Sequence, residues 1–355
     1  MGPVIVPFFI SHKGCPHRCV FCDQKRITGS AGEIPSEADI LDTIAAGRKS
    51  AGNVPVEVAF YGGTFTGLPR DVQERLLRPL QPLIRSGGVV SVRVSTRPDA
   101  IDPEATDFLS GMGVGTVELG VQSMDDEVLS LAGRGHTAAD TVSACRTLKE
   151  AGMKVGIQLM PGLPGDDTDR ALASMDRVVG LSPDFIRIYP ALVIAGTRLA
   201  ELYQCGEYLP LDLEGALLVC KVMLHRAIAS GVRVIRIGLQ ATAELESGAV
   251  LAGPYHPAFR QLVEADLFYD LIAKLAGGGG IVSPLAVFCS PSRVSDVIGQ
   301  RRGNLRRLER ERGVRVEEVR GDPAFSTTEL AVASGKTVKR GDILRDLEYR
   351  GGALS

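Results

Sequence analysis

Hydrophobic and polar positions follow two different periods along the first two thirds of the chain. Short runs rich in β-branched residues are separated by longer segments in which apolar residues recur with the 3.6-residue period of a helix. The short runs lie at residues 4–10, 56–60, 89–95, 116–121, 155–160, 185–189 and 232–239. The helical segments between them lie at 37–49, 70–85, 127–132, 138–151, 168–179 and 213–230. This alternation predicts repeated βα units around a parallel sheet.

The ends of the helical segments carry signals of their own. Ser36 and Thr137 stand directly before a helical segment, where a hydroxyl can cap the first free backbone N–H groups. Gly87, Gly152 and Gly231 fall where helices are expected to end. These signals predict the same boundaries as the hydrophobic period.

Seven strand runs predict an α/β fold built as a partial (β/α)6-type barrel of about six to seven units, one repeat short of a closed eight-stranded barrel. We place this barrel at residues 1–240 and a smaller α+β module at 241–355, because the pattern changes there. The second part has a Gly-Pro-rich turn at 253–257, a helix at 258–276, a glycine run at 277–280 and a strand at 281–288. In such barrels the chemistry lies at the carboxyl ends of the strands.

Composition limits the classes of partner. Of 355 residues, 45% are apolar, and 40 Lys and Arg against 42 Asp and Glu give a net charge of −2. No overall basic field favours nucleic acid, so any RNA contact must be local. No apolar run approaches the roughly 20 residues of a membrane span, and the apolar start has no basic segment before it. We therefore expect a first strand, no membrane contact and a cytoplasmic protein.

A basic segment at residues 293–315 is the one local candidate for an RNA contact. If it is helical, Arg302, Arg306 and Arg310 share one face and could meet phosphates. The alternative is an ordinary solvated helix face. Tyr255 and His256, in the Gly-Pro-rich turn, could reach over the barrel mouth, or could simply form the turn.

Seven cysteines are present, and their distribution is uneven. Cys15, Cys19 and Cys22 fall within eight residues directly after the first strand run. Clustered thiols in a long chain indicate a metal or cluster site. The other four are predicted to be small buried apolar side chains: Cys145, Cys205, Cys220 and Cys289.

The C-x3-C-x2-C spacing of the first three cysteines places three thiols on one loop at the end of the first strand. Three thiolates can ligate three corners of an iron–sulfur cube, which leaves one iron open to a further ligand. A structural zinc site is the alternative, but only His12 and His17 stand close by, and no second Cys or His pair follows at zinc-site spacing.

Polar residues and glycines stand at the ends of several later strand runs. Gly62 and Gly63 follow the second run and would let backbone approach a small ligand, although such a pair can also be a plain turn. Further polar groups near strand ends are Arg97, Glu118, Gln122 and Gln158. These groups suit contacts to a ribose or a carboxylate, and the alternative is a solvated rim.

Together these motifs resemble the radical S-adenosylmethionine (SAM) superfamily. The resemblance implies a [4Fe–4S] cluster on Cys15, Cys19 and Cys22, whose open iron chelates SAM. It implies reductive cleavage of SAM to a 5′-deoxyadenosyl radical, with ferredoxin or flavodoxin as the electron donor. It also implies that SAM is contacted by residues at the strand ends: Gly62, Gly63, Thr64, Arg97, Glu118, Gln122 and Gln158.

Two segments resemble the radical SAM half of the Elongator catalytic subunit in particular. They are the run Met-Pro-Gly-Leu-Pro-Gly at 160–165 and the run Arg-Ile-Tyr-Pro-Ala-Leu-Val-Ile-Ala-Gly-Thr-Arg-Leu at 187–199. The resemblance, over about residues 1–240, implies modification of the wobble uridine of tRNA. The chain departs from Elongator in its short cysteine spacing and in stopping where the acetyltransferase domain would follow, so carboxymethylation is not inherited.

Two other functions stay open at this point. One is a radical SAM enzyme that acts on a small metabolite or a peptide, which suits the near-neutral net charge. The other is a non-catalytic iron–sulfur or zinc protein that serves in electron transfer or as a scaffold. A scaffold would not need the polar strand ends. The sequence does not indicate an oligomeric state.

Overall fold

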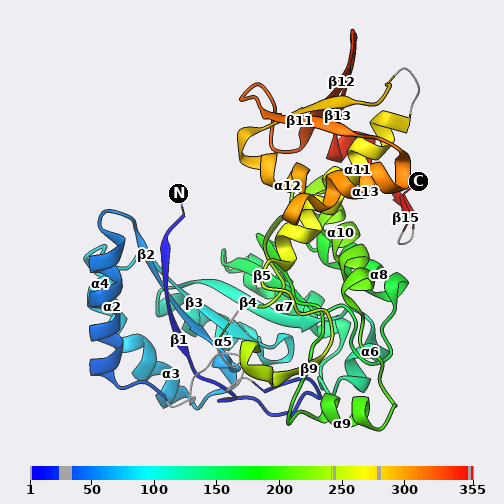
Figure 1. The fold of residues 1–355 in the computed structure, drawn as a ribbon. Helices are drawn as coiled ribbons and strands as arrows, with labels where there is room; N and C mark the ends of the chain where they lie inside the picture. Colours follow the sequence, from blue (N-terminus) through cyan, green and yellow to red (C-terminus); the bar gives the residue numbers. More distant parts are fainter. Residues whose placement is uncertain are drawn as a thin grey trace.

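A computed structural model describes residues 2–23, 34–240, 242, 245–277, 281–350 and 353–354. Most of the predicted glycine run, residues 278–280, lies outside the described residues. The fold has two parts, a curled sheet with helices and a smaller module beyond one end of it (Figure 1).

Seven parallel strands form the main sheet, in the order β1-β2-β3-β4-β5-β6-β8. They are β1 (Val4–Phe9), β2 (Val56–Tyr61), β3 (Ser91–Thr96), β4 (Val114–Gln122), β5 (Lys154–Leu159), β6 (Phe185–Ile188) and β8 (Arg233–Ile237). Each coincides with a predicted run to within a few residues. Neighbours in the chain are neighbours in the sheet, which confirms the predicted partial barrel.

Helices follow the strands and cover the outer face of the sheet (Figure 1). They are α2 (Glu37–Ala51), α3 (Arg70–Leu77), α4 (Gln81–Arg85), α5 (Pro103–Gly111), α6 (Asp126–Leu131), α7 (Ala138–Glu150), α8 (Thr168–Gly180), α9 (Arg198–Gln204) and α10 (Leu213–Ala229). Ser36 and Thr137 form complete capping boxes, as predicted. The predicted helix at 70–85 is instead divided, since Pro79 and Pro82 cannot donate a helical hydrogen bond, and α5 and α9 were not predicted.

The two faces of the main sheet differ in chemistry because side chains alternate along a strand. One face is apolar and packs in the large core, with Val58, Val94 and Ile157 almost fully buried. On the other face, charged side chains of adjacent strands pair with one another, as Glu57 does with Arg93 at 2.7 Å. The concave side of the half-barrel is therefore polar.

The module beyond the sheet is built on a long helix, α11 (Phe259–Gly277). Its four-stranded sheet has the order β11-β10-β12-β13. Its elements are β10 (Leu285–Cys289), α12 (Val294–Ile298), α13 (Gly303–Arg312), β11 (Val316–Gly321), β12 (Glu329–Ser334), β13 (Thr337–Asp342), α14 (Ile343–Asp346), β14 (Tyr349–Arg350) and β15 (Ala353–Leu354). An α+β module was predicted, and its first strand begins four residues later than expected.

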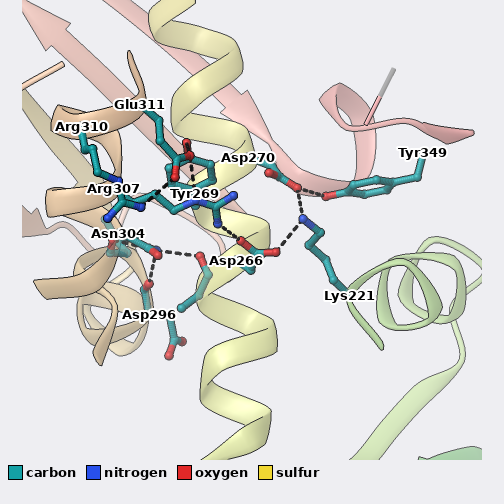
Figure 2. A network of polar contacts seen from close by, with 12 residues as sticks. Lys221, Asp266, Tyr269, Asp270, Asp296, Asn304, Arg307, Arg310, Glu311 and Tyr349 are labelled. Carbon is teal, nitrogen blue, oxygen red and sulfur yellow. Dashed lines mark hydrogen bonds and ion pairs between the residues drawn. The ribbon is translucent and has the colours of Figure 1, made fainter. Parts of the chain in front are cut away.

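A buried polar network joins this module to the barrel (Figure 2). Lys221 of α10 lies 2.6 Å from Asp266 and 2.7 Å from Asp270, both on α11. The Tyr349 hydroxyl donates to Asp270 at 2.8 Å, and Arg307 of α13 pairs with Asp266 at 2.6 Å. Burial raises the pKa of Asp270, whereas the nearby Lys221 ammonium lowers it. The Lys221, Asp266 and Asp270 charges thus compensate one another largely away from water, while Arg307 closes the network from a partly exposed position.

The four cysteines outside the cluster were predicted to be buried apolar side chains. Cys145, Cys220 and Cys289 are buried, as expected, but Cys205 is exposed. It follows the last turn of α9, where the chain leaves the core. None of the described helices combines the length and apolarity required to cross a bilayer.

Candidate active site

The three clustered cysteines lie on the loop of residues 11–23 that follows β1, here termed the cysteine loop. All three thiols are free and half-buried. The Cys15 Sγ atom lies 3.2 Å from the Thr64 Oγ1 atom, which belongs to the loop after β2. The predicted ligands therefore sit at the carboxyl end of the first two strands.

The loop after β2 holds the cysteine loop through its backbone. The His12 N–H donates to the Gly62 carbonyl at 2.8 Å, and the Thr64 N–H donates to the Lys13 carbonyl at 2.9 Å. A Cβ atom on Gly63 would lie 2.5 Å from the Lys13 carbonyl oxygen and 2.8 Å from that of Ile10. Gly63 is thus needed where the two backbones meet.

Two further elements hold the other side of the cysteine loop. The Val20 N–H donates to the Ala132 carbonyl at the end of α6, and the Leu199 N–H of α9 donates to the Val20 carbonyl. Phe21 is 8% exposed and packs in an apolar cluster with residues of α6 and α9. Its position indicates a packing role.

Arg134, on the connection between α6 and α7, contacts one of the thiols directly. Its role could not be seen in the sequence. Its side chain is buried, and its Nη1 atom donates to the Cys19 Sγ atom at 3.1 Å. Its Nη2 atom donates to the Gly120 carbonyl, and its buried Nε atom has no hydrogen-bond partner in the part of the chain that the structure describes. A buried cation beside a thiol favours the thiolate, which is the form that binds iron.

The electrostatics of Cys22 show why the thiols need a cationic partner. Burial, together with the nearby Cys19 and Cys15, raises the pKa of the Cys22 thiol to about 12, although Arg134 lowers it. Three thiolates this close repel one another unless positive charge is placed among them.

A buried histidine lies two residues after Arg134. Burial, and to a lesser degree the nearby Arg134, lowers the pKa of His136 to about 4. Its Nε2 atom lies 3.2 Å from the Val121 carbonyl, so this nitrogen is the donor of a neutral ring. Its Nδ1 atom has no hydrogen-bond partner among the residues described. His136 therefore offers an unused acceptor close to the end of β4.

The ends of β4 and β5 bring two predicted residues together. The Gln158 Nε2 atom donates to the Gln122 Oε1 atom at 3.0 Å. The ladder between these strands is irregular between Gly120 and Gln122, and Gln122 has a φ of 69°. A Cβ atom on Gly120 would lie 2.9 Å from Gln122 Nε2 and 3.4 Å from Arg134 Nη2. The amide pair and the cysteine loop thus meet through Arg134.

Glu118, another predicted residue, has its carboxylate inside the polar network of the concave face. It pairs with Arg93 at 2.8 Å and with Arg187 at 2.9 Å. The Tyr61 hydroxyl donates to the same carboxylate at 3.2 Å. Both Glu118 oxygens therefore already have partners, which come from the strands β2, β3 and β6 on either side of β4.

Arg97 follows β3 and is 4% exposed. Its guanidinium is held by both oxygens of Asp99, at 2.9 and 2.8 Å. The structure thus places this residue at the carboxyl edge of the sheet, in a fixed orientation.

The Gly-Pro-rich turn after β9 (Val250–Ala252) returns to the barrel rim, where β9 pairs with the short β7 (Val193–Ile194). Tyr255 and His256 line a small cavity there, together with residues that follow β6 and β8. The buried Tyr255 hydroxyl finds no hydrogen-bond partner within the described residues, and His256 Nδ1 accepts from the Ala258 N–H at 3.0 Å. The turn therefore does reach the rim.

The residues missed from the sequence share one property, which is a partner far along the chain. Arg134 contacts Cys19 across 115 positions, and Arg187 contacts Tyr61 across 126. The one local signal was the pair of glycines that flank Arg134, since Gly133 and Gly135 both have positive φ. Those glycines could have marked a loop that approaches other backbone closely.

The donor set fits an iron–sulfur cluster with an open corner. Within the described residues, no three His, Cys, Asp or Glu side chains converge closely enough to hold a single metal ion. A four-iron cube instead takes each thiolate on a different iron. Three thiols on one loop, a buried guanidinium beside one of them and its unpartnered Nε suit such a cluster and an anionic ligand next to it.

Comparison with known families agrees with this geometry. Residues 9–178 match the Radical SAM superfamily, and residues 183–268 match the Radical SAM C-terminal domain. The first match contains the cysteine loop, Arg134 and each of the strand-end residues predicted from the sequence.

Comparison with known proteins gives relatives of two kinds. A tRNA uridine(34) acetyltransferase of Methanocaldococcus jannaschii is 39% identical over 263 residues, which cover 61% of this chain and 47% of the relative. The chain thus spans about half the length of that protein. An uncharacterized protein of the same archaeon is 30% identical over 226 residues, 60% of this chain and 69% of the relative.

Among solved structures, Elp3 of Methanocaldococcus infernus with an N-terminal deletion is similar with a TM-score of 0.61 at 22% identity. The match covers 97% of this chain and 76% of that one. It supports the overall fold, including the placement of a second module after the half-barrel.

Proposed function

The chain belongs to the radical SAM superfamily, and from that premise we propose that it is an enzyme that modifies tRNA. The single observation that carries the proposal is the cysteine loop, in which three thiols stand beside a buried guanidinium at the mouth of a half-barrel. Membership of this family implies a [4Fe–4S] cluster and SAM as cofactors. When both are bound and an electron is supplied, they provide a 5′-deoxyadenosyl radical.

The residues of the chain have separate tasks in this proposal. Cys15, Cys19 and Cys22 ligate the cluster, and Arg134 compensates part of its negative charge through the bond to Cys19. Among the described residues the buried Arg134 Nε atom has no hydrogen-bond partner, so it is available to donate to a carboxylate such as that of SAM.

The strand ends are our candidates for the remaining contacts to SAM. Gly62, Gly63 and Thr64 bring backbone close to the cysteine loop, and the Gln122–Gln158 pair offers amide groups at the next ends of the sheet. We assign Glu118 and Arg97 to the same site but not to direct contact with SAM, because Glu118 already pairs with Arg187 and Arg97 already pairs with Asp99. Their task is then to fix the groups around them.

The substrate is proposed from the relatives and from the site's position. The 39% identical relative is named for a reaction on uridine 34 of tRNA, and the match lies in the part of the chain that forms the half-barrel. Because the chain spans about half of that relative, acetyl transfer is not part of the proposal. We propose a cytoplasmic enzyme that receives its electrons from ferredoxin or flavodoxin.

The proposal is tested with the anaerobically reconstituted, dithionite-reduced protein, SAM and unmodified tRNA transcript. We expect tRNA to stimulate release of 5′-deoxyadenosine and a new nucleoside mass to appear after tRNA digestion. A Cys19→Ala variant should lose both the release of 5′-deoxyadenosine and the new nucleoside mass. The control variant Cys205→Ala, at the exposed cysteine, should keep both.

Two outcomes would overturn parts of the proposal. SAM cleavage that no tRNA stimulates, and that leaves tRNA unmodified, would move the substrate to a small metabolite or a peptide. Stoichiometric zinc in the protein, with no uptake of iron under anaerobic reconstitution, would remove the radical chemistry altogether.

A further inference from the structure

Three arginines on the distal module form an exposed cationic patch, here termed the distal arginine surface: Arg301, Arg302 and Arg306. All three side chains are exposed. Among the residues that the structure describes, none of the three has an acidic partner, and the Arg306 guanidinium only donates to the Arg301 carbonyl. Their positive charges are left to the solvent.

This surface differs from the stripe that the sequence predicted. Arg302 does not lie on the helix, because α13 begins at Gly303 and Arg302 has a left-handed φ of 62°. Arg310 is on the helix but pairs with Glu311 at 2.9 Å. Arg301, with a φ of 51°, takes its place in the patch.

Other arginines of the same segment serve the structure of the module and make the contrast clear. Arg293 pairs with Glu264 at 3.0 Å and with Asp296 at 2.9 Å. Arg307 pairs with Asp266 and lies over the Tyr269 ring at 3.8 Å (Figure 2). The segment therefore places its paired arginines against α11 and its unpaired ones in solvent.

The turn that carries Arg301 and Arg302 is rigidly supported. Asn304 is 8% exposed, and its Nδ2 atom donates to the Ala265 carbonyl at 2.7 Å and to the Asp296 carbonyl at 3.1 Å. A Cβ atom on Gly299 would lie 2.8 Å from the Asn304 N atom. The backbone of the turn is thus fixed before any ligand arrives, which lowers the entropy cost of binding.

Arg301 and Arg302 are two consecutive non-glycine residues with left-handed φ, a backbone conformation that is unfavourable for residues with a Cβ atom. Glycine would adopt these angles freely, yet Arg301 and Arg302 stand here. Backbone strain of this kind concentrates at ligand-binding sites, where the contacts of the side chain to a ligand offset the unfavourable backbone conformation.

The elements around the turn have the order of an RNA-binding unit. Strand β10, helices α12 and α13 and strand β11 follow one another, and β10 and β11 pair in parallel. The turn at residues 299–302 joins the two helices and begins with a glycine. In KH modules a loop between two such helices clamps the backbone of about four unpaired nucleotides.

The distal arginine surface lies far from the cysteine loop. Figure 1 shows α13 beyond one end of the barrel, whereas the cysteine loop, at the end of β1, lies toward the opposite end. A small substrate could not touch both sites at once. A folded RNA can.

We propose that the distal arginine surface binds the phosphate backbone of a single-stranded segment of RNA. The choice of tRNA as the RNA that carries this segment rests on the proposed function. The chain has a net charge of −2, so a polyanion is attracted by this local patch and not by the protein as a whole. The half-barrel then acts on another part of the same RNA.

The test measures binding of a fluorescent 12-nucleotide single-stranded RNA, and of a tRNA transcript, by anisotropy across a salt series. The variant is R301Q/R302Q/R306Q. For three lost contacts we expect the slope of log affinity against log salt to fall by about 2 for the single strand. Release of 5′-deoxyadenosine without RNA should not change.

Two control variants make the result specific. R301K/R302K/R306K keeps the charge and should keep most of the salt slope. R75Q/R85Q/R146Q removes three exposed arginines from the barrel helices α3, α4 and α7 and should bind RNA like the wild type. Equal melting temperatures of all variants show that each is folded.

Unchanged affinity and slope in R301Q/R302Q/R306Q, or no RNA binding by wild type at low salt, would overturn the proposal. Its failure is distinguishable from that of the proposed function. If the single strand binds through these arginines but tRNA is never modified, the surface stands and the substrate is wrong. If tRNA is modified equally by wild type and variant and binds both alike, the substrate stands and the surface is wrong.

Discussion

At the cysteine loop the functional groups are packed against other parts of the protein. At the distal arginine surface, by contrast, only the backbone is packed, and the functional side chains are exposed to solvent. Gly63 has no room for a Cβ atom, and Arg134 is buried against Cys19. Arg301 and Arg302, by contrast, have free space and no acidic partner among the described residues. A site for reactive chemistry must exclude water, while a surface that reads a backbone must leave its charges available.

This difference predicts how the two regions respond to substitution. Changes at the cysteine loop should destroy cofactor binding or stability outright, and changes at the arginine surface should alter only RNA binding. The predictions below begin with the largest effect.

Removing one ligand should abolish the cluster. Wild-type protein reconstituted without oxygen should hold about four irons and four sulfides per chain, and Cys19→Ala should hold almost none, because two thiolates cannot retain the cube. Iron and sulfide assays with the absorption spectrum measure this. R301Q/R302Q/R306Q should match wild type, and a lower iron content in that variant would break the comparison.

Filling the space at Gly63 should displace the cysteine loop. In Gly63→Val the Cβ atom meets the carbonyl oxygens of Ile10 and Lys13, so we expect most of the iron to be lost and unfolding to be easier by about 1–3 kcal/mol. Thermal unfolding and iron content are the measurements. Gly111→Ala is the matched control, since a Cβ atom there meets nothing within 4 Å. If both variants keep iron and SAM affinity, the loop is not as tightly packed as described.

The junction offers a change that should separate the two ends. Lys221→Met leaves Asp266 and Asp270 buried without their shared ammonium, which should cost about 3–5 kcal/mol. Denaturant unfolding measures the loss, and limited proteolysis should then release the distal module first. The iron content of protein that stays folded should match wild type, and a parallel loss of iron would show that the two ends are not independent.

A smaller effect concerns pH at the barrel rim. Burial raises the pKa of Asp166 to about 6 from 3.8, although the Gly162 N–H lowers it by donating to the carboxylate. Between these two values the folded state binds more protons than the unfolded state, so the contribution of Asp166 to stability falls as pH rises from about 4 to about 6. We expect a loss of about 1 kcal/mol across this range in wild type relative to Asp166→Asn, seen in melting temperatures at each pH. Identical pH profiles would contradict the shift.

The sequence predicted the parts of the fold that depend on local pattern. The strand runs and capping residues such as Ser36 were found because period and caps act over a few residues. The cysteine loop was found because its ligands lie close together along the chain. Its spacing alone indicates three thiols on one loop.

What could not be predicted depends on contacts across the fold. Arg134 comes to Cys19 only when the connection after α6 packs on the loop after β1. The predicted arginine stripe was wrong for a different reason. The helical period of the sequence continues through Arg301 and Arg302, but the backbone forms a left-handed turn at these two residues. Periodicity does not show where a helix begins when the supporting side chain, here Asn304, finds its partner on another helix.

The central claim is that this chain is a radical SAM enzyme that acts on tRNA. It is tested most directly by the amount of 5′-deoxyadenosine released from SAM by reduced protein with a full cluster, with and without tRNA. The account predicts slow release by wild type alone, faster release when tRNA is added, and none from Cys19→Ala. A protein that holds four irons, is fully reduced and still releases no 5′-deoxyadenosine under either condition would contradict it.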